Sequence, residues 1–356
     1  MTSRERVLAA MRHRRPDRPP FDFSWGFAPA QLQRFRDATG ADDPEDYFGA
    51  DTRMLRPLPT RLTTDYSRYL GELPPGAHVD EWGIGRRPTA STDAAHAHLD
   101  GFIYSLVGAS GERDALDYPL PDLDADYRYA DFPARVAAVQ ARGIAALAAM
   151  ECTIFEVAWY MRSMERLLLD FADGSAFAST LLDRITAVRE AQARRYAESG
   201  ADVICMGDDV GTQRGMLMSV RMWRAWLKPR LGRVIASAKA VRPDVLVFYH
   251  SDGDVTAIVD DLVEIGVDIL NPVQPECMDP AALRRRFGSR LGLWGTIGTQ
   301  STFPFGSPED VRREVKTRID EVGAGGGLFL APTHMIEPEV PFENIVAFVE
   351  AVKAAG

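Results

Sequence analysis

The stretch Asp244–Gln274, DVLVFYHSDGDVTAIVDDLVEIGVDILNPVQ, contains a strand, a helix and a second strand in direct succession. Val245–Tyr249 is a continuous apolar run, which predicts a buried strand. Residues 255–266 read as a short helix, and residues 267–274 form the next apolar strand. A strand, a helix and a strand in this order predict a right-handed crossover and a parallel sheet.

The same alternation repeats through the C-terminal part of the chain, where six strand–helix units follow one another from about residue 143. The expected strands lie near residues 144–153, 201–211, 244–250, 267–274, 291–300 and 327–334. The expected helices cover residues 155–173, 176–200, 220–241, 255–266, 279–288, 308–323 and 341–355, and Ser307 is expected to cap the sixth.

Two further units are expected from the N-terminal part, one of them around residues 18–25, and eight units would close a barrel. An open doubly wound sheet is the rival architecture. However, no G-x-G-x-x-G motif follows a strand, and the chain has no Walker A motif. We therefore predict an α/β fold, a single (β/α)8 TIM barrel with an irregular N-terminal extension.

All 356 residues are expected to form one domain. Residues 1–135 are its irregular part and contain the first barrel units, whereas residues 136–356 hold the regular units. Within the irregular part, residues 3–14 predict a short helix, and residues 78–87 and 101–106 predict short strands or a hairpin.

Composition excludes several classes of protein. The net charge of −10 and pI of about 5.2 argue against a nucleic-acid-binding surface. Three widely spaced cysteines do not suggest a disulfide framework. The N-terminus lacks the apolar core of a signal peptide, and no apolar run is long enough to span a membrane. We expect a cytoplasmic protein that acts on a small molecule, and a homodimer is compatible with these features.

In a barrel of this type the active site lies at the C-terminal ends of the strands. Nearly every expected strand ends in residues that can bind a metal, move a proton or hold a polar ligand. These residues are Glu151 and Cys152, Asp208 and Asp209, His250 and Asp252, Asn271 and Gln274, Thr296 and Gln300, and Thr333 and His334.

The histidines divide into two groups. His250 and His334 both follow strongly apolar strands, whereas His13, His78, His96 and His98 lie in the first helix or the irregular N-terminal part. His96 and His98 lie in HAHLD, which we interpret as a solvated loop. Together with Asp252, the two strand-end imidazoles suit a zinc site, and the same donor set also suits non-haem iron. Without a metal, the three residues could form an acid–base set. Cys277 is a candidate additional ligand, with a plain loop thiol as the alternative.

A second group of candidates lies in GDDVGTQRG, residues 207–215. Arg214 could hold a substrate carboxylate through two parallel hydrogen bonds. Asp208 is a candidate base, and Asp209 and Gln213 are candidates for substrate binding. A charge network that only holds the loop is an equally weighted alternative. Tyr160 lies in an apolar helix where core packing is the simpler interpretation, but we include it among the substrate-binding candidates.

Several segments together resemble the uroporphyrinogen decarboxylase superfamily: RERVLAAMRHRRPDRPP, DEWG, FEVAWYMRSMERLLLD, GDDVGTQRG, YHSDGD, VDILNPVQPE, LGLWGTIGTQ and FLAPTHMIEPEVPFENI. The resemblance covers nearly the whole chain and implies a (β/α)8 barrel. Decarboxylases of this superfamily need no cofactor and hold substrate carboxylates with an arginine-rich N-terminal segment. Here residues 21–35, FDFSWGFAPAQLQRF, lack that paired-arginine motif. His334 matches a histidine of the decarboxylases, so decarboxylation of another acid stays open.

The other branch of the superfamily is similar to cobalamin-dependent methyltransferases, in which a His-x-Cys pair and a later cysteine bind zinc. Those positions match His250, Asp252 and His334, so both thiolates are replaced. The resemblance therefore implies zinc-dependent methyl transfer from a small methylated ether or amine to a corrinoid protein. The alternatives are a cofactor-free decarboxylase of a small or tetrapyrrole acid and a barrel that binds a small molecule without reacting it.

From these arguments, the expected metal ligands are His250, Asp252 and His334, and these three residues with Asp208 are the expected catalytic residues. The expected substrate-binding residues are Trp25, Tyr160, Asp209, Gln213, Arg214, Asn271 and Gln274.

Overall fold

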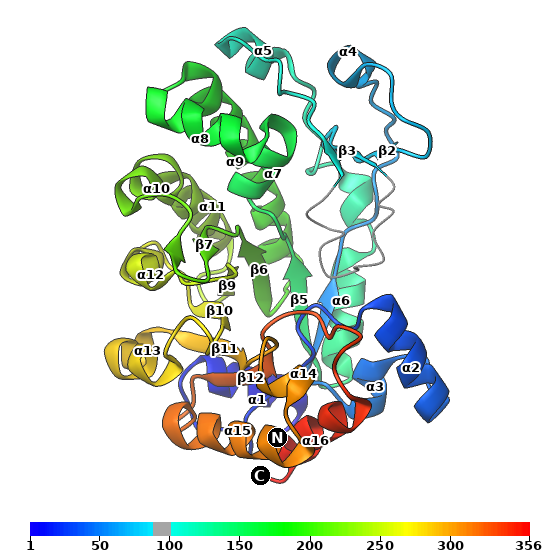
Figure 1. Ribbon diagram of the computed structural model, residues 1–356, viewed down its shortest axis with the longest axis vertical. Coiled ribbons are helices and arrows are strands. Elements are labelled where there is room, and N and C mark those ends of the chain that lie inside the picture. The colour runs from blue at the N-terminus through cyan, green and yellow to red at the C-terminus, as the bar shows by residue number, and fades with distance from the viewer. Residues whose placement is uncertain (88–100) are drawn as a thin grey trace.

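The computed structural model describes residues 1–87 and 101–356, and a curled parallel sheet dominates it (Figure 1). The interpretation of His96 and His98 as a solvated loop lies outside the described residues. Within those ranges the sheet has seven strands in the order β1-β5-β6-β9-β10-β11-β12, and all neighbouring pairs are parallel. The strands are β1 (Thr52–Leu55), β5 (Ala145–Ala149), β6 (Val203–Gly207), β9 (Leu246–His250), β10 (Ile269–Val273), β11 (Gly292–Ile297) and β12 (Leu328–Pro332).

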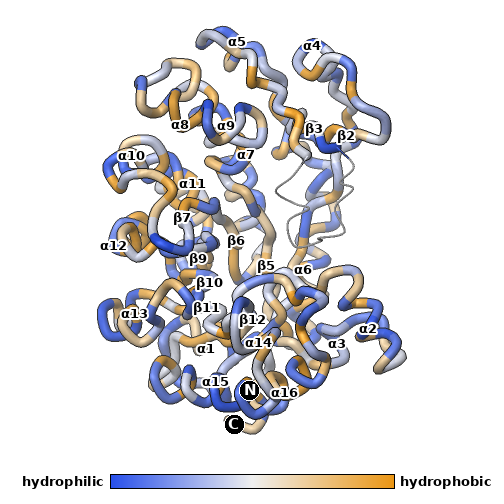
Figure 2. The backbone as a smooth tube through the Cα atoms, viewed as in Figure 1, coloured by the Kyte–Doolittle hydropathy of each residue, from blue (hydrophilic) through white to orange (hydrophobic). Residues whose placement is uncertain are grey.

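Alternate residues of each strand enter different cores. On β9, Leu246 and Phe248 belong to a small inner cluster, whereas Val247 and Tyr249 belong to the large cluster shared with the surrounding helices. Because side chains alternate between the two faces of a strand, a strand that is buried on both faces must be apolar throughout. The apolar runs of the sequence satisfy this requirement, and the hydropathy colouring of β5 and β6 shows it (Figure 2).

Helix α1 (Ser3–Met11) packs against the strands at the N-terminal side of the curled sheet. Val7, Ala10 and Met11 join the inner cluster of strand residues, so this end of the sheet interior is filled by apolar side chains. The capping box of Thr2 and Glu5 fixes the start of the helix. The opposite, C-terminal edge of the strands is therefore the edge that can hold a site.

A short segment around Phe21 lies between the two outer strands of the sheet. Its residue Phe21 forms a parallel bridge with Leu330 of β12. On its other side, the carbonyl of Phe21 accepts the N–H of Asp51, which directly precedes β1. The sheet thus curls round as in a TIM-like barrel, with this segment bonded to both outer strands.

Helices connect the strands, as predicted, and cover the outer face of the sheet (Figure 1). The larger ones are α6 (Phe132–Ala141), α7 (Phe155–Arg162), α8 (Met164–Asp173), α9 (Ala176–Glu198), α10 (Val220–Trp226), α11 (Lys228–Val241), α12 (Val259–Glu264), α13 (Pro280–Phe287), α15 (Pro308–Val322) and α16 (Phe342–Lys353), with the shorter α14 (Thr302–Phe305) before α15. Ser307 caps α15, as expected.

Two helices expected to be continuous are each broken in two. The predicted helix 155–173 breaks at Ser163, which has φ of 73° and whose hydroxyl caps the start of α8. The predicted helix 220–241 breaks at Leu227, just before Pro229, because proline cannot donate a helical hydrogen bond. The prediction was wrong at both places because apolar periodicity continues across a short break.

The N-terminal part is less regular, as expected, and contains α2 (Pro29–Thr39), α3 (Pro44–Phe48), α4 (Ser67–Leu70) and α5 (Glu112–Asp117). The expected short strands are β2 (His78–Val79), β3 (Gly85–Arg86) and β4 (Phe102–Ile103), which form a small antiparallel sheet. Of the helices in the described ranges, none has the length and apolar character needed to cross a bilayer.

Candidate active site at the C-terminal edge of the sheet

His250 is the last residue of β9, and the alternation of the strand turns its side chain inward. It follows Leu246 and Phe248 at intervals of two, and both of those residues lie in the inner cluster. Asn271 follows Ile269 on β10 in the same way and pairs with His250 across the ladder. The two polar side chains therefore meet above the apolar interior of the sheet.

A hydrogen bond fixes the orientation of the His250 ring. Its Nδ1 lies 2.7 Å from Oδ1 of Asn271, which can only accept a proton. The Nδ2 group of Asn271 is 3.4 Å from the carbonyl of Trp294, which supports this orientation of the amide. Nδ1 must then carry a hydrogen, and Nε2 points to the opposite side.

Two carboxylates face Nε2 of His250. Nε2 of His250 lies 3.6 Å from Oδ1 of Asp209 and 3.9 Å from Oδ1 of Asp252. The backbone N–H of Asp252 donates to Oδ1 of Asp209 at 2.8 Å and ties the two acidic residues together. One ligand atom from each of these three residues lies within 4.8 Å of the other two. This group can hold a metal ion.

His334 approaches the same group from the loop after β12. Its Nε2 lies 3.9 Å from Oδ2 of Asp252. Burial, followed by the proximity of His250, lowers the pKa of His334 to about 4, so its ring is neutral at pH 7. The expected ligands His250, Asp252 and His334 thus lie next to one another, but the tightest group includes Asp209 in place of His334.

The adjacent residue Asp208 points the other way. Its carboxylate accepts the backbone N–H groups of Ile154 and Glu156, each at 3.0 Å, at the start of α7. Burial raises the pKa of Asp208 to about 6, although these hydrogen bonds favour its ionised form. In the structure Asp208 therefore anchors the start of α7, and its catalytic role stays a prediction.

Glu156, which the sequence analysis did not select, links the site to Tyr160. Its Oε1 accepts the hydroxyl of Tyr160 at 2.8 Å, and its Oε2 accepts the N–H of Asp209 at 3.1 Å. Burial, with Asp209 and Asp208 close by, raises the pKa of Glu156 well above its ordinary value. Burial and the nearby acids thus disfavour a negative charge on Glu156. An acidic residue inside the apolar helix FEVAWYM was the signal that could have revealed it.

Of the remaining candidates, Gln274 and Cys277 lie beside the loop that carries Asp252. Oε1 of Gln274 accepts the N–H of Gly253 at 2.7 Å and so holds this loop. The Sγ atom of Cys277 lies 3.7 Å from the same oxygen, and burial raises the pKa of its thiol to about 11. The group within 4.8 Å of His250 does not include Cys277 among the residues described.

Gln213 and Arg214 are exposed at the turn between the short strands β7 (Gly211–Thr212) and β8 (Gly215–Met216). This hairpin contacts the loop after β9, which carries Asp252, because the N–H of Asp254 donates to the carbonyl of Thr212 at 2.8 Å. Both side chains therefore lie at the rim beside the site, and their binding role stays a prediction.

Trp25 belongs to the site although it is far from His250 in the chain. Its ring meets the His250 ring edge-on, with 5.0 Å between the centroids. Asp22, three residues earlier, is buried and accepts the hydroxyl of Thr52 at 2.8 Å. Burial raises the pKa of Asp22 to about 7. The N-terminal segment thus supplies both an aromatic wall and a buried acid.

A pocket of about 410 Å³ lies at the ends of β1 and β5 and includes Tyr160 in its lining. Cys152 also lines it, but burial raises the pKa of its thiol well above the ordinary value, which leaves it protonated. Arg189 lines the pocket with a buried guanidinium group that donates to the carbonyls of Thr153 and Cys152. Arg86 and Arg128 line it as well. Tyr160 of the pocket lining donates to Glu156, which also accepts the N–H of Asp209, so hydrogen bonds connect the pocket to Asp209 beside His250.

The geometry of this site can be compared with known proteins. A family model described as uroporphyrinogen decarboxylase (URO-D) matches residues 137–355, which include β5 to β12 and both site histidines. The chain belongs to this family. The resemblance noted in the sequence is thereby confirmed, and Asp209, His250, Asp252 and His334 lie within the matched residues.

Sequence relatives carry the name uroporphyrinogen decarboxylase. One from Coxiella burnetii is 26% identical over 177 residues, which are 49% of this chain and 46% of the relative. One from Serratia proteamaculans is 41% identical over 76 residues, 21% of each chain. One from Thermus thermophilus is 27% identical over 175 residues, 49% of this chain and 47% of the relative. The chain therefore spans about half the length of the relatives it matches, or less.

A solved structure described as a methyltransferase from Methanosarcina mazei covers 99% of both chains, with a TM-score of 0.66 and 22% sequence identity. At this identity the likeness concerns the fold. The likeness in fold also covers nearly all of residues 1–136, which the family model does not match.

Proposed function

We propose that this URO-D family protein is a metal-dependent methyltransferase that moves a methyl group from a small methylated ether or amine to a corrinoid protein. The observation that carries the proposal is the group of Asp209, His250 and Asp252, whose ligand atoms lie within 4.8 Å of one another. The description of the Methanosarcina mazei structure as a methyltransferase points the same way.

The donor set fits zinc. One imidazole and two carboxylates are ordinary zinc ligands, and catalytic zinc sites use three protein ligands with one position left open. His250 meets a further condition, since its second ring nitrogen is hydrogen-bonded to Asn271, as metal-bound histidines usually are. His334 is neutral at pH 7 and lies next to Asp252, so it is available as a fourth ligand or as a proton acceptor.

Bound zinc would supply Lewis-acid polarisation of the heteroatom that carries the methyl group. The protein's own residues orient the substrate and exclude water. Trp25 closes one side of His250, and Tyr160 forms the wall toward the neighbouring pocket. Glu156 accepts the backbone N–H of Asp209, and burial disfavours a further negative charge there.

We also infer that the segment around Phe21 takes the eighth strand position of a (β/α)8 barrel. The support is its parallel bridge to Leu330 and its hydrogen bond to the N–H of Asp51. In this arrangement Trp25 lies just after this strand, at the same C-terminal edge as His250, which accounts for the contact between the two rings.

A cofactor-free decarboxylase is the second candidate, and the pocket beside Tyr160 favours it. Arg189, Arg86 and Arg128 line that pocket, and guanidinium groups are suited to carboxylates. The sequence relatives named uroporphyrinogen decarboxylase support this candidate. It would use the neutral His334 and the carboxylates as a metal-free acid–base set.

Metal analysis of the purified protein separates the candidates. We expect about one equivalent of zinc in the wild type, and its loss in the His250→Ala and Asp209→Asn variants. We then expect methyl transfer from a methylated amine or ether to cob(I)alamin only in the zinc-loaded protein. A protein without stoichiometric metal that releases CO2 from a small acid would overturn the methyltransferase in favour of the decarboxylase. If the protein shows neither methyl transfer nor CO2 release, and replacing His250 and His334 changes no activity, it is a barrel that binds a small molecule without reacting it.

A further inference from the structure

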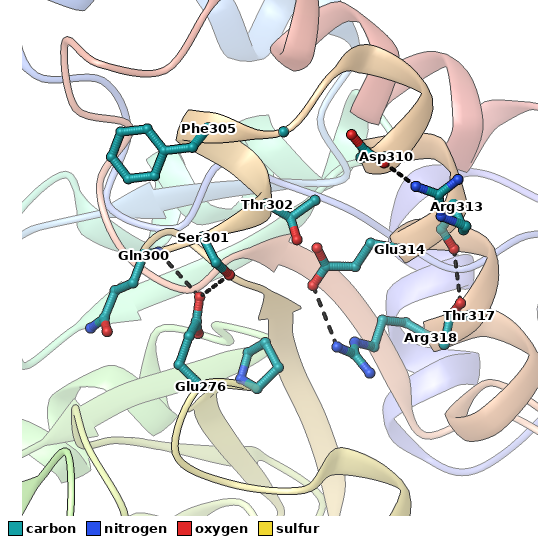
Figure 3. A pocket seen from close by; sticks show the side chains of 12 residues that line it. Glu276, Gln300, Ser301, Thr302, Phe305, Asp310, Arg313, Glu314, Thr317 and Arg318 are labelled. Atoms are coloured by element: carbon teal, nitrogen blue, oxygen red, sulfur yellow. Dashed lines mark hydrogen bonds and ion pairs between the residues drawn. The ribbon is translucent and has the colours of Figure 1, made fainter.

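A second pocket, of about 940 Å³, lies outside the site just described (Figure 3). It is formed by the loop after β10, the loop and short helix after β11, and the face of α15. None of His250, Asp252, Asp209 and His334 lines it. The pocket contains two glutamates, Glu276 and Glu314, which the proposed reaction does not use.

Each glutamate has one carboxylate oxygen engaged and one that is not. Oε1 of Glu276 accepts the N–H of Gln300 at 3.1 Å and the hydroxyl of Ser301 at 3.0 Å. Oε1 of Glu314 accepts the N–H of Gly298 at 3.3 Å and lies 3.4 Å from Nη2 of Arg318. The Oε2 atoms of both residues are buried and have no hydrogen-bond partner among the described parts of the chain. The Glu314 side chain is only 10% exposed.

The two carboxylates converge on Gly298. Its N–H contacts Glu314, and a Cβ atom added to it would lie 2.2 Å from Oε1 of Glu276. A side chain at this position would therefore displace the Glu276 carboxylate. Such an arrangement brings two negative groups together, although a buried carboxylate oxygen without a partner destabilises the folded protein. A ligand that donates to both oxygens would remove this cost.

The charge of the pocket favours a cation. Three carboxylates line it, those of Glu276, Asp310 and Glu314, against the two guanidinium groups of Arg313 and Arg318. Arg313 is paired with Asp310. Arg318 divides its contacts between Glu314 and Glu321, at 3.4 and 3.6 Å. One negative charge is thus left over in the lining.

The size and lining of the pocket favour an organic cation over a bare metal ion. Phe305 lines the same pocket with a ring that is 74% exposed, although large apolar side chains are usually buried. A hydrocarbon chain can pack on such a ring, and a cation is attracted to its face. A primary ammonium group carries three N–H donors, enough for the two free Oε2 atoms and a hydroxyl such as that of Thr302.

We propose that the pocket between Glu276 and Glu314 is a binding site for a primary aliphatic amine, with the ammonium group between the two carboxylates and the hydrocarbon chain against Phe305. The site is separate from the histidine group and does not depend on the proposed methyl transfer. It is linked to that group through Thr299, whose hydroxyl lies 3.0 Å from that of Thr333, the residue before His334.

Isothermal titration of the full chain with 1,4-diaminobutane tests the proposal. We expect saturable one-to-one binding, weakened about tenfold or more in Glu276→Gln and in Glu314→Gln, because each loses one charge-assisted hydrogen bond. Glu309→Gln is the matched control on α15. This residue is exposed and does not line the pocket, so binding should be unchanged. Gly298→Ala places a methyl group against Glu276 and should also weaken binding.

Four further measurements decide between explanations. The uncharged 1,4-butanediol should not bind, and Phe305→Ala should weaken the diamine while leaving the melting temperature unchanged. The His250→Ala variant should bind diamine like the wild type, which separates this site from the proposed active site. The proposal is overturned if the wild type does not bind the diamine, if both glutamine variants bind it normally, or if MgCl2 binds in its place and the diamine does not.

Discussion

Nδ1 of His250 lies 2.7 Å from Oδ1 of Asn271 on the neighbouring strand. This single contact decides which ring nitrogen faces the carboxylates of Asp209 and Asp252. The contact exists because both residues face inward at the ends of paired strands. The first prediction follows from it.

Asn271→Ala should weaken zinc binding about 10- to 100-fold, the usual effect of removing the hydrogen-bond partner of a histidine ligand. Without the acceptor, the His250 ring can rotate and change its tautomer. A competitive titration with a zinc chelator measures the change, with Gln33→Ala, an exposed amide on α2, as the control. An unchanged dissociation constant would mean that His250 does not ligate the metal.

Asp208 and Asp209 are adjacent in the chain and should respond differently to the same substitution. Asp209→Asn removes a carboxylate beside His250 and should lower zinc content. Asp208→Asn should retain zinc but lower the free energy of unfolding by about 1–2 kcal/mol, since it weakens the hydrogen bonds at the start of α7. Metal analysis and urea unfolding of the two variants provide the measurement. The opposite pattern would exchange the two roles.

Asp22 should make the stability of the protein depend on pH. The folded-state pKa of about 7 lies above the value of about 3.9 expected in the unfolded chain. The unfolded state therefore releases this proton first, and the stabilisation present at low pH is lost as the pH rises toward 7, by up to about 4 kcal/mol. Asp22→Asn should remove this contribution.

Urea unfolding at pH 5 and at pH 8 measures the effect of Asp22. The free energy of unfolding of Asp22→Asn, taken relative to that of the wild type, should be higher at pH 8 than at pH 5. Asp42→Asn serves as the control, because the side chain of Asp42 is 97% exposed. If the difference in free energy of unfolding between Asp22→Asn and the wild type is the same at both pH values, Asp22 does not titrate in this range.

Glu156 should tolerate loss of its charge but not loss of its side chain. Burial and two neighbouring carboxylates raise the pKa of Glu156 and favour its neutral form, so Glu156→Gln should change the free energy of unfolding by less than about 0.5 kcal/mol. Glu156→Ala leaves a cavity and removes the acceptor for the Asp209 N–H, and should cost about 2 kcal/mol or more. Chemical unfolding at pH 7 compares the two. Equal losses in both variants would indicate an ionised Glu156.

The order of strands and helices was determined by the sequence, because a parallel strand buried on both faces must be an apolar run. Those runs located β5 to β12 and the polar residues that follow them. The same runs could not locate the helix breaks at Ser163 and Leu227, since neither break interrupts the apolar periodicity. The sequence analysis expected a barrel unit around residues 18–25, but its place between the two outer strands depends on a contact between residues about 300 positions apart.

The chemistry of the site was determined by the sequence only as a set of candidates. His250, Asp252 and His334 were identified because each follows an apolar strand. Whether Asp208 or Asp209 faces His250 depends on the direction in which the chain leaves β6, and this was decided by the packing of α7. Trp25 and Glu156 reach the site from a distant segment and from a buried helix. Only tertiary contacts could bring them there, because burial and closure act between residues that are far apart along the chain.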